Sequence, residues 1–167
     1  LMPLCGLLAA GCSAETGSTP ASALHADPSA FDGERALSEA RAFVELGPKV
    51  AGTPACMAAA EYIRDRLAGL GLDAAIDDFE EESPAGATRF RNVEGVLRGG
   101  GRDWIILGCH YDTKEGIAPG FAGANDSGSG VGVLLELARI ICAGGGAGKT
   151  PCAIRTVPPD QGSGPDT

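Results

Sequence analysis

The chain has 167 residues, of which 44% are apolar and 21% are charged, a balance typical of a single globular domain. Its 13 lysine and arginine residues stand against 22 aspartate and glutamate residues, which gives a formal net charge of -9. This charge argues against nucleic acid as a partner, because phosphate binding needs an excess of basic side chains.

The N-terminal segment predicts export rather than a part of the fold. Residues 1–12 are apolar but too short to span a bilayer as a helix, and residues 13–30 form a linker rich in Ser, Thr, Ala and Pro. Within the first segment, "LAAGC" ending at Cys12 resembles the lipobox of bacterial lipoproteins, whose cysteine carries the lipid. We therefore expect a periplasmic or cell-surface lipoprotein that is anchored to the membrane through Cys12. A secreted protein with an unlipidated leader and a buried apolar terminus are the alternatives.

Two helices are predicted next. Asp32 can cap a helix that runs to about Leu46, and three apolar residues recur on one of its faces, namely Leu37, Ala40 and Val44. A second helix is expected after Thr53, where apolar residues again repeat at helical spacing until Gly71 ends the pattern. Each helix has one apolar face, so both are expected to pack on the surface of the domain.

The rest of the chain predicts a mixed sheet. Residues 72–80 and 90–97 indicate two antiparallel strands, because the segment between them contains proline and glycine. Residues 103–109 include the apolar run "WIIL", which is typical of a central strand covered on both faces. Residues 130–141 are apolar on nearly every side and predict a buried helix, and a further strand begins at residues 153–157. We therefore expect an α/β fold with a mixed central sheet and flanking helices.

Two patterns in this chain resemble binding sites but have simpler interpretations. Residues 143–150, "AGGGAGKT", approximate a phosphate-binding loop, but they follow a predicted helix and precede a predicted strand, the reverse of the order such a loop needs. We predict a solvent loop there and no nucleotide. Four cysteines lie outside the leader, namely Cys56, Cys109, Cys142 and Cys152. They could form disulfides, in three possible pairings, or they could be small buried apolar side chains. None of them has the C-x-x-C spacing of a cysteine zinc site.

The strongest chemical signal is the stretch "GCHYDTKEGIAPGFAGANDSGSG" at residues 108–130. His110, one of only two histidines, follows the apolar strand and shares a strand face with Asp112. Asp126 lies in a glycine-rich turn before the predicted buried helix. A neutral imidazole and carboxylates are natural zinc ligands, and a ligating histidine usually donates its second ring N–H to an acceptor. These residues alone leave open either a metal site or a structural hydrogen bond between histidine and aspartate.

The combination of motifs is more specific than its parts. "GCHYDT", "FAGANDSGSG" and "VGVLLELARI" resemble, in order and spacing, the zinc-dependent aminopeptidases of peptidase family twenty-eight and the related glutaminyl-peptide cyclotransferases. "VAGTP", "DDFEEESPAGATRFRNVEGVL" and "DWIILG" fit the same family. The resemblance implies that His110 is a zinc ligand, that Asp112 orients it, and that Asp126 is the carboxylate that bridges two zinc ions. It also implies a cis peptide bond between Asp126 and Ser127, a peptide as substrate, and two zinc ions in an aminopeptidase or one in a cyclotransferase.

The resemblance covers only part of that family's site. The family places its general-base glutamate after a strand that residues 153–157 match in their first part, but no Glu follows Glu136 and no His follows His110. We therefore expect a truncated domain, with residues 31–157 as the N-terminal part of a zinc peptidase domain and residues 158–167 as a disordered or aberrant tail. The chain by itself then holds no catalytic residue, since the general base is expected in the missing half.

Three functions are consistent with these patterns. The first hypothesis is an exported zinc aminopeptidase that hydrolyses N-terminal peptide bonds. The alternative from the same fold is a glutaminyl-peptide cyclotransferase that forms N-terminal pyroglutamate, a reading that "CHYDTK" favours. The third, from a different class, is an inactive fragment or a non-catalytic, lipid-anchored domain.

Overall fold

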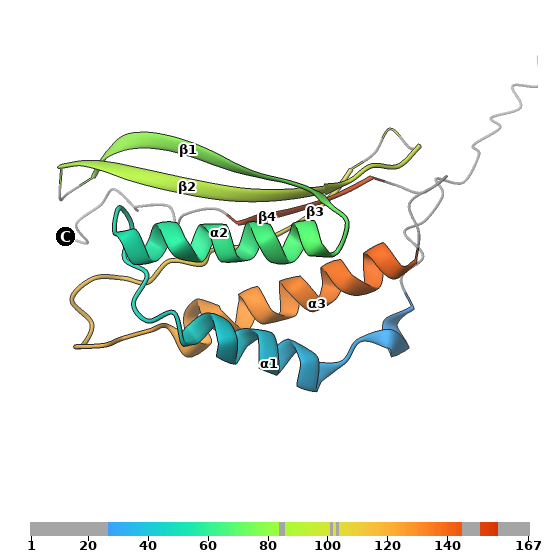
Figure 1. The fold of residues 1–167 in the computed structure, drawn as a ribbon, viewed down its shortest axis with the longest axis horizontal. Helices are drawn as coiled ribbons and strands as arrows, with labels where there is room; N and C mark the ends of the chain where they lie inside the picture. Colours follow the sequence, from blue (N-terminus) through green and yellow to red (C-terminus); the bar gives the residue numbers. More distant parts are fainter. Residues whose placement is uncertain (1–26, 84–85, 101, 103, 145–150, 157–167) are drawn as a thin grey trace, which may run out of the picture.

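The structure is a computed structural model that describes residues 27–83, 86–100, 102, 104–144 and 151–156. A mixed four-stranded sheet forms one layer, and the helices lie on one of its faces (Figure 1). The sheet order is β1-β2-β4-β3, and the strands are β1 (Asp73–Ser83), β2 (Gly86–Leu97), β3 (Ile105–Cys109) and β4 (Cys152–Thr156). Only the β3–β4 pair is parallel; β1–β2 and β2–β4 are antiparallel. The predicted α/β class and mixed sheet are confirmed.

The helices begin where the sequence predicted, because their capping side chains satisfy free backbone N–H groups. The elements are η1 (Pro28–Ala30), α1 (Gly33–Val44), α2 (Pro54–Gly69), a π-helical turn η2 (Ala124–Ser129) and α3 (Gly130–Ala143). Asp32 Oδ1 accepts the N–H groups of Glu34 and Arg35 at 3.0 and 3.1 Å, and Thr53 Oγ1 accepts that of Cys56 at 3.3 Å. α3 is buried along most of its length, as predicted.

The buried face of α1 differs from the predicted one. The residues that face the core are Ala36, Ala40 and Phe43, while Leu37 is 42% exposed. α1 packs on α3 (Figure 1), where Gly132 lets the two backbones approach closely. Small side chains therefore fit at the contact, and the larger Leu37 turns toward solvent.

The position of β3 in the sheet also differs from the prediction. Among the described strands β3 lies at the edge, because β4 comes between β2 and β3. The side chains that point toward the helices are Ile105, Leu107 and Cys109, whereas Ile106 is 64% exposed. The prediction of a central strand covered on both faces is thus wrong for the described sheet: the apolar run predicted a buried strand, but the described helices cover only one face.

Several predicted segments lie outside the described residues. These are the leader at 1–12, most of the linker at 13–30, most of the phosphate-loop-like stretch at 143–150, and the tail at 158–167. Lipid attachment at Cys12 therefore stays a prediction. The last residues of the predicted linker form η1, and the carbonyl of Ala30 accepts a hydrogen bond from Arg139 of α3 at 2.8 Å. Within the described residues, none of the helices has the length and apolar character needed to cross a membrane.

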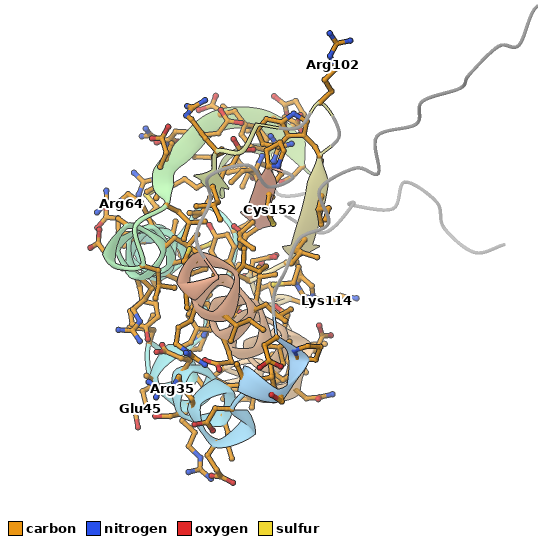
Figure 2. The ribbon with its side chains drawn as sticks, turned by 90° about the vertical axis from the view of Figure 1, so that its right-hand side faces the viewer. Arg35, Glu45, Arg64, Arg102, Lys114 and Cys152 are labelled. Carbon is orange, nitrogen blue, oxygen red and sulfur yellow. The ribbon has the colours of Figure 1, made fainter. Side chains whose placement is uncertain are left out.

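The four cysteines outside the leader have free thiols in this structure. Cys152 of β4 is 1% exposed and lies inside the molecule, while charged side chains such as Arg35 and Arg64 project from the surface (Figure 2). Burial raises the pKa of each of the four thiols, that of Cys109 to about 11. The four cysteines thus act as buried or half-buried apolar side chains, one of the two predicted alternatives.

The close contact between α1 and α3 yields a test. A methyl group at Gly132 would lie 2.3 Å from the carbonyl oxygen of Ala36 and 2.8 Å from Cβ of Ala40. Gly132→Ala should therefore force the helices apart and lower the free energy of unfolding by about 1–3 kcal/mol, measured by urea denaturation followed by circular dichroism. Gly130→Ala in the same helix is the matched control, because its Cβ would lie 3.4 Å from Cys109 Cβ. An equal effect of both substitutions would contradict the close approach.

Candidate metal centre

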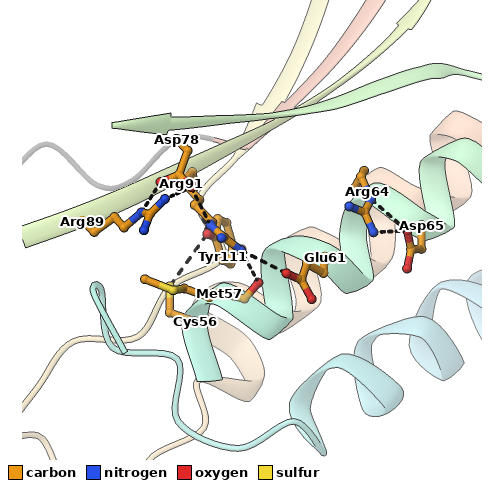
Figure 3. A network of polar contacts seen from close by, with 9 residues as sticks. All are labelled: Cys56, Met57, Glu61, Arg64, Asp65, Asp78, Arg89, Arg91 and Tyr111. Atoms are coloured by element: carbon orange, nitrogen blue, oxygen red, sulfur yellow. Dashed lines mark hydrogen bonds and ion pairs between the residues drawn. The ribbon is translucent and has the colours of Figure 1, made fainter. Parts of the chain in front are cut away.

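The first part of the site follows β3 directly. His110 and Asp112 flank Tyr111, which is 2% exposed and points into the core. The Tyr111 hydroxyl donates to the carbonyl of Arg91 on β2 at 2.9 Å, and the Cys56 thiol of α2 lies 3.8 Å from it (Figure 3). Burial raises the pKa of Tyr111 well above its ordinary value, so the hydroxyl keeps its proton and remains a donor. Tyr111 therefore anchors the segment that carries His110 and Asp112 to β2 and α2.

Arg91 extends this anchor across the surface. Its guanidinium lies 3.3 Å from Asp78 of β1 and 3.2 Å from Glu61 of α2 (Figure 3). Arg89 of the same strand forms a two-point ion pair with Asp78 at 2.6 and 2.7 Å. The side chain of Arg91 thus links β2 to β1 and α2, while its backbone carbonyl accepts the hydrogen bond from Tyr111.

The second part of the site is the turn η2, which precedes α3. The peptide bond between Asp126 and Ser127 is cis, which confirms what the family resemblance implied. The Ser127 hydroxyl donates a short hydrogen bond to the carbonyl of His110, and the Gly128 N–H donates to the carbonyl of Gly123 at 2.8 Å. Ser127 thereby ties the Asp126 turn to the end of β3.

The structure brings together the three side chains that the sequence singled out. His110 Nε2 lies 2.7 Å from Asp126 Oδ1, and His110 Nδ1 lies 3.4 Å from Asp112 Oδ1. Asp112 is 7% exposed, and burial raises the pKa of its carboxyl, while the neighbouring His110 opposes that rise. The Asp126 side chain is 76% exposed. The imidazole is thus held between a buried carboxylate on one nitrogen and an accessible carboxylate on the other.

These donor atoms fit zinc as two of its ligands. Zinc bonds to imidazole nitrogen and carboxylate oxygen are about 2.0–2.2 Å long, which puts two ligand atoms of a tetrahedral ion about 3.4 Å apart. The 2.7 Å contact is a hydrogen bond, which would open by about 1 Å or less to admit an ion between the two atoms. His110 Nδ1 and Asp112 Oδ1, both buried, lie 3.4 Å apart, so the carboxylate stands beside the ring nitrogen but the hydrogen bond that would orient a ligating ring is not closed. In the described part of the chain, however, no cluster of three or more His, Cys, Asp or Glu side chains could hold a metal.

Sequence reasoning missed two groups that shape this site. The buried Tyr111 could have been recognised, because it alternates with His110 and Asp112 and so points to the opposite face. The hydroxyl of Ser127 had no such signal, since a serine in a glycine-rich turn is common for local reasons. Its bond to His110 spans 17 positions of sequence and depends on the fold.

Comparison with known proteins shows what this chain resembles. Residues 92–154 match the sequence profile of Peptidase family M28. The glutaminyl-peptide cyclotransferase of Drosophila melanogaster is 33% identical over 97 residues, which cover 58% of this chain and 27% of that protein. The crystal structure of Porphyromonas gingivalis glutaminyl cyclase superposes with a TM-score of 0.72 at 27% identity, over 82% of this chain and 51% of that one. A Zn-dependent exopeptidase from Parabacteroides distasonis gives a TM-score of 0.69 at 25% identity, over 81% and 49%.

The predicted resemblance to peptidase family M28 and to the glutaminyl-peptide cyclotransferases is therefore confirmed. The chain spans 27% of the curated relative and 51% of the cyclase structure, so it matches only a part of each. One of these structures is of a Zn-dependent exopeptidase, so the comparisons support zinc in general and leave the number of ions open. Cyclotransferases and an exopeptidase both appear among these proteins, so enzyme-family similarity is shown while the reaction is not.

Gly123 offers a test of how the Asp126 turn is built. Its φ is +63°, and a Cβ there would lie 2.4 Å from the Asp126 carbonyl oxygen and 2.8 Å from Thr113 Cγ2. Gly123→Ala should displace the turn and separate His110 from Asp126, which changes the His110 ring signals in NMR spectra. Gly120→Ala, at φ +72° with open space around the added Cβ, is the control for backbone strain alone, about 1–2 kcal/mol. Unchanged His110 signals in Gly123→Ala would show that the turn does not depend on this contact.

Proposed function

We propose that this chain supplies part of the active site of a zinc-dependent glutaminyl-peptide cyclotransferase, which converts the N-terminal glutamine of a peptide to pyroglutamate. The observation that carries the proposal is the 2.7 Å contact between His110 Nε2 and Asp126 Oδ1, formed where β3 ends and α3 begins. The choice of reaction is supported by the similarity to the Drosophila cyclotransferase and the Porphyromonas cyclase.

The chemistry of the reaction explains what these side chains would do. A bond forms between the peptide α-amino nitrogen and the side-chain amide carbon of glutamine, and ammonia leaves. Zinc, when bound, would act as a Lewis acid on the amide carbonyl. His110 would bind the ion through Nε2, while Asp112 holds the ring at Nδ1 and keeps the Nε2 lone pair directed toward the site. Asp126 would supply a carboxylate oxygen, and its exposed side chain leaves that side open to a peptide.

The described residues would contribute two ligands, whereas a catalytic zinc normally has three from protein. We therefore propose that a further ligand, and the group that accepts a proton from the attacking amine, lie outside the described residues. The described glutamate that is buried, Glu136, cannot serve as that group, because both of its oxygens accept hydrogen bonds from Arg139.

Aminopeptidase activity is the second candidate, and it was the first hypothesis from the sequence. The similarity to a Zn-dependent exopeptidase favours it. In that reaction a water oxygen bonds to the carbonyl carbon of the first peptide bond, the bond from that carbon to nitrogen breaks, and the shortened peptide leaves with a new α-amino group as the N-terminal amino acid is released. His110 and Asp112 would have the same roles, and Asp126 would bridge two ions, as the family resemblance implies. The two reactions thus use the same described side chains and differ in the attacking atom.

Zinc titration of the purified chain tests the metal centre. We expect binding, measured by isothermal titration calorimetry, that His110→Ala or Asp126→Ala each abolishes or weakens strongly. Asp112→Asn should weaken zinc binding by about 10–100-fold, the usual effect of removing the partner of a ligating histidine. His25→Ala, a change of the only other histidine, is the matched control and should bind like the unchanged chain. Equal zinc binding by the His110→Ala chain would refute the assignment.

The reaction is tested on the product of the complete gene. With zinc present, a peptide that begins with glutamine should lose ammonia, detected by mass spectrometry, and a matched peptide that begins with leucine should stay intact. His110→Ala should lower the rate by about a hundredfold or more, because loss of a ligand should cost at least the roughly 10–100-fold seen when only a ligand's partner is removed. Release of leucine from the second peptide would favour the aminopeptidase instead. No change in either peptide would favour the non-catalytic alternative.

A further inference from the structure

Lys49 is a buried cation that has no carboxylate partner among the described residues. It lies between α1 and α2, its residue is 1% exposed, and no acidic side chain of the described residues is within ion-pair distance of it. Its ammonium group instead donates to three backbone carbonyls, those of Gly47 at 2.6 Å, Ala122 at 3.2 Å and Phe43 at 3.4 Å. The ammonium also lies 4.6 Å from the centre of the Phe43 ring. All three N–H donors of the side chain are thus used.

The backbone of Lys49 makes a second attachment. Its N–H donates to Thr113 Oγ1 at 2.7 Å, and its carbonyl accepts the N–H of Thr113 at 3.1 Å. The side chain holds Ala122 at the same time. One residue, remote in sequence, therefore binds both ends of the segment 113–122.

That segment is the connection between the two proposed metal ligands. Its middle part, residues 114–120, is exposed and contains two glycines at positive φ, so it imposes little restraint of its own. Thr113 comes three residues after His110, and Ala122 comes four before Asp126. The distance between the two ligands thus depends both on the Ser127–His110 hydrogen bond and on what holds the ends of this segment.

Gly123 couples the position of Ala122 to that of Asp126, because its backbone is in close contact with the Asp126 turn. A Cβ at Gly123 would lie within 2.8 Å of both the Thr113 side chain and the Asp126 carbonyl, so these groups already touch the Gly123 backbone. The carbonyl of Gly123 also accepts the N–H of Gly128, which follows the Asp126 turn. A shift of Ala122 would therefore move the carboxylate of Asp126.

We infer that Lys49 is a positioning residue for the metal centre, because it holds both ends of the segment 113–122 and so adds a second restraint, beside the Ser127–His110 hydrogen bond, on the separation of His110 and Asp126. This inference rests on the proposed zinc site. A methionine would fill nearly the same volume but would leave the carbonyls of Gly47, Ala122 and Phe43 without this donor, so the test must separate positioning from stability.

Two measurements on the 167-residue chain test this inference. Lys49→Met should weaken zinc binding by about 10–100-fold, the range for groups that orient ligands. It should also raise the amide hydrogen exchange rate of residues 122–128 by about tenfold or more while α2 stays protected, because the bonds that close the segment are lost. Lys49→Arg keeps the charge and the donors and should restore much of both properties. If Lys49→Met does not fold, Lys49→Gln, which keeps two N–H donors, replaces it.

A matched control separates positioning from stability. Ile63→Ala removes a buried side chain of α2 and leaves a cavity in the core. We would compare it with each Lys49 variant at temperatures chosen so that the two chains have the same free energy of unfolding. The inference is overturned if Lys49→Met binds zinc as tightly as the Ile63→Ala chain and exchanges residues 122–128 at the same rate. If the unchanged chain binds no zinc, the proposed metal site fails, and the exchange measurement alone still decides whether Lys49 holds the segment.

Discussion

The junction between the end of β3 and the start of α3 is the constraint on which the rest of the site depends. The Ser127 hydroxyl donates a hydrogen bond to the carbonyl of His110, so a side chain of one ligand-bearing segment is joined directly to the backbone of the other. This contact brings an imidazole and a carboxylate to 2.7 Å although 16 positions of sequence separate them. Two such groups bind a cation more tightly when the fold already holds them in place, because less side-chain entropy is then lost on binding.

Helix α1 packs against this junction and against α3. A Cβ at Gly128 would lie 2.7 Å from Val44 Cγ2, so the end of α1 packs directly under the Asp126 turn. At the other end of α1, Glu136 of α3 is 1% exposed and accepts the N–H of Asp32 at 2.9 Å. Hydrogen bonds from Arg139 lower the pKa of the Glu136 carboxyl, so it is ionised at neutral pH and fully bonded. α1 is thereby fixed to α3 at both ends.

Local signals in the sequence were enough for most elements. Asp32 and Thr53 predicted the starts of two helices, because a side-chain oxygen at the cap satisfies N–H groups within three residues. His110, Asp112 and Asp126 were singled out because their residue types and spacing matched a known family. On the buried face of α1, Ala40 was predicted correctly, but Ala36 is buried in place of Leu37, since only the smaller side chain fits against α3.

The sequence by itself determined the caps, the helical and strand periodicity and the choice of candidate ligands, since each of these depends on neighbours a few residues apart. The tertiary structure alone decided that β4 lies between β2 and β3, because strand order is set by pairing between segments far apart in the chain. It also decided that Lys49 binds Thr113 and Ala122, which lie 64 and 73 positions away. Such contacts follow from the shared packing of the sheet and helices, and no local pattern in the sequence records them.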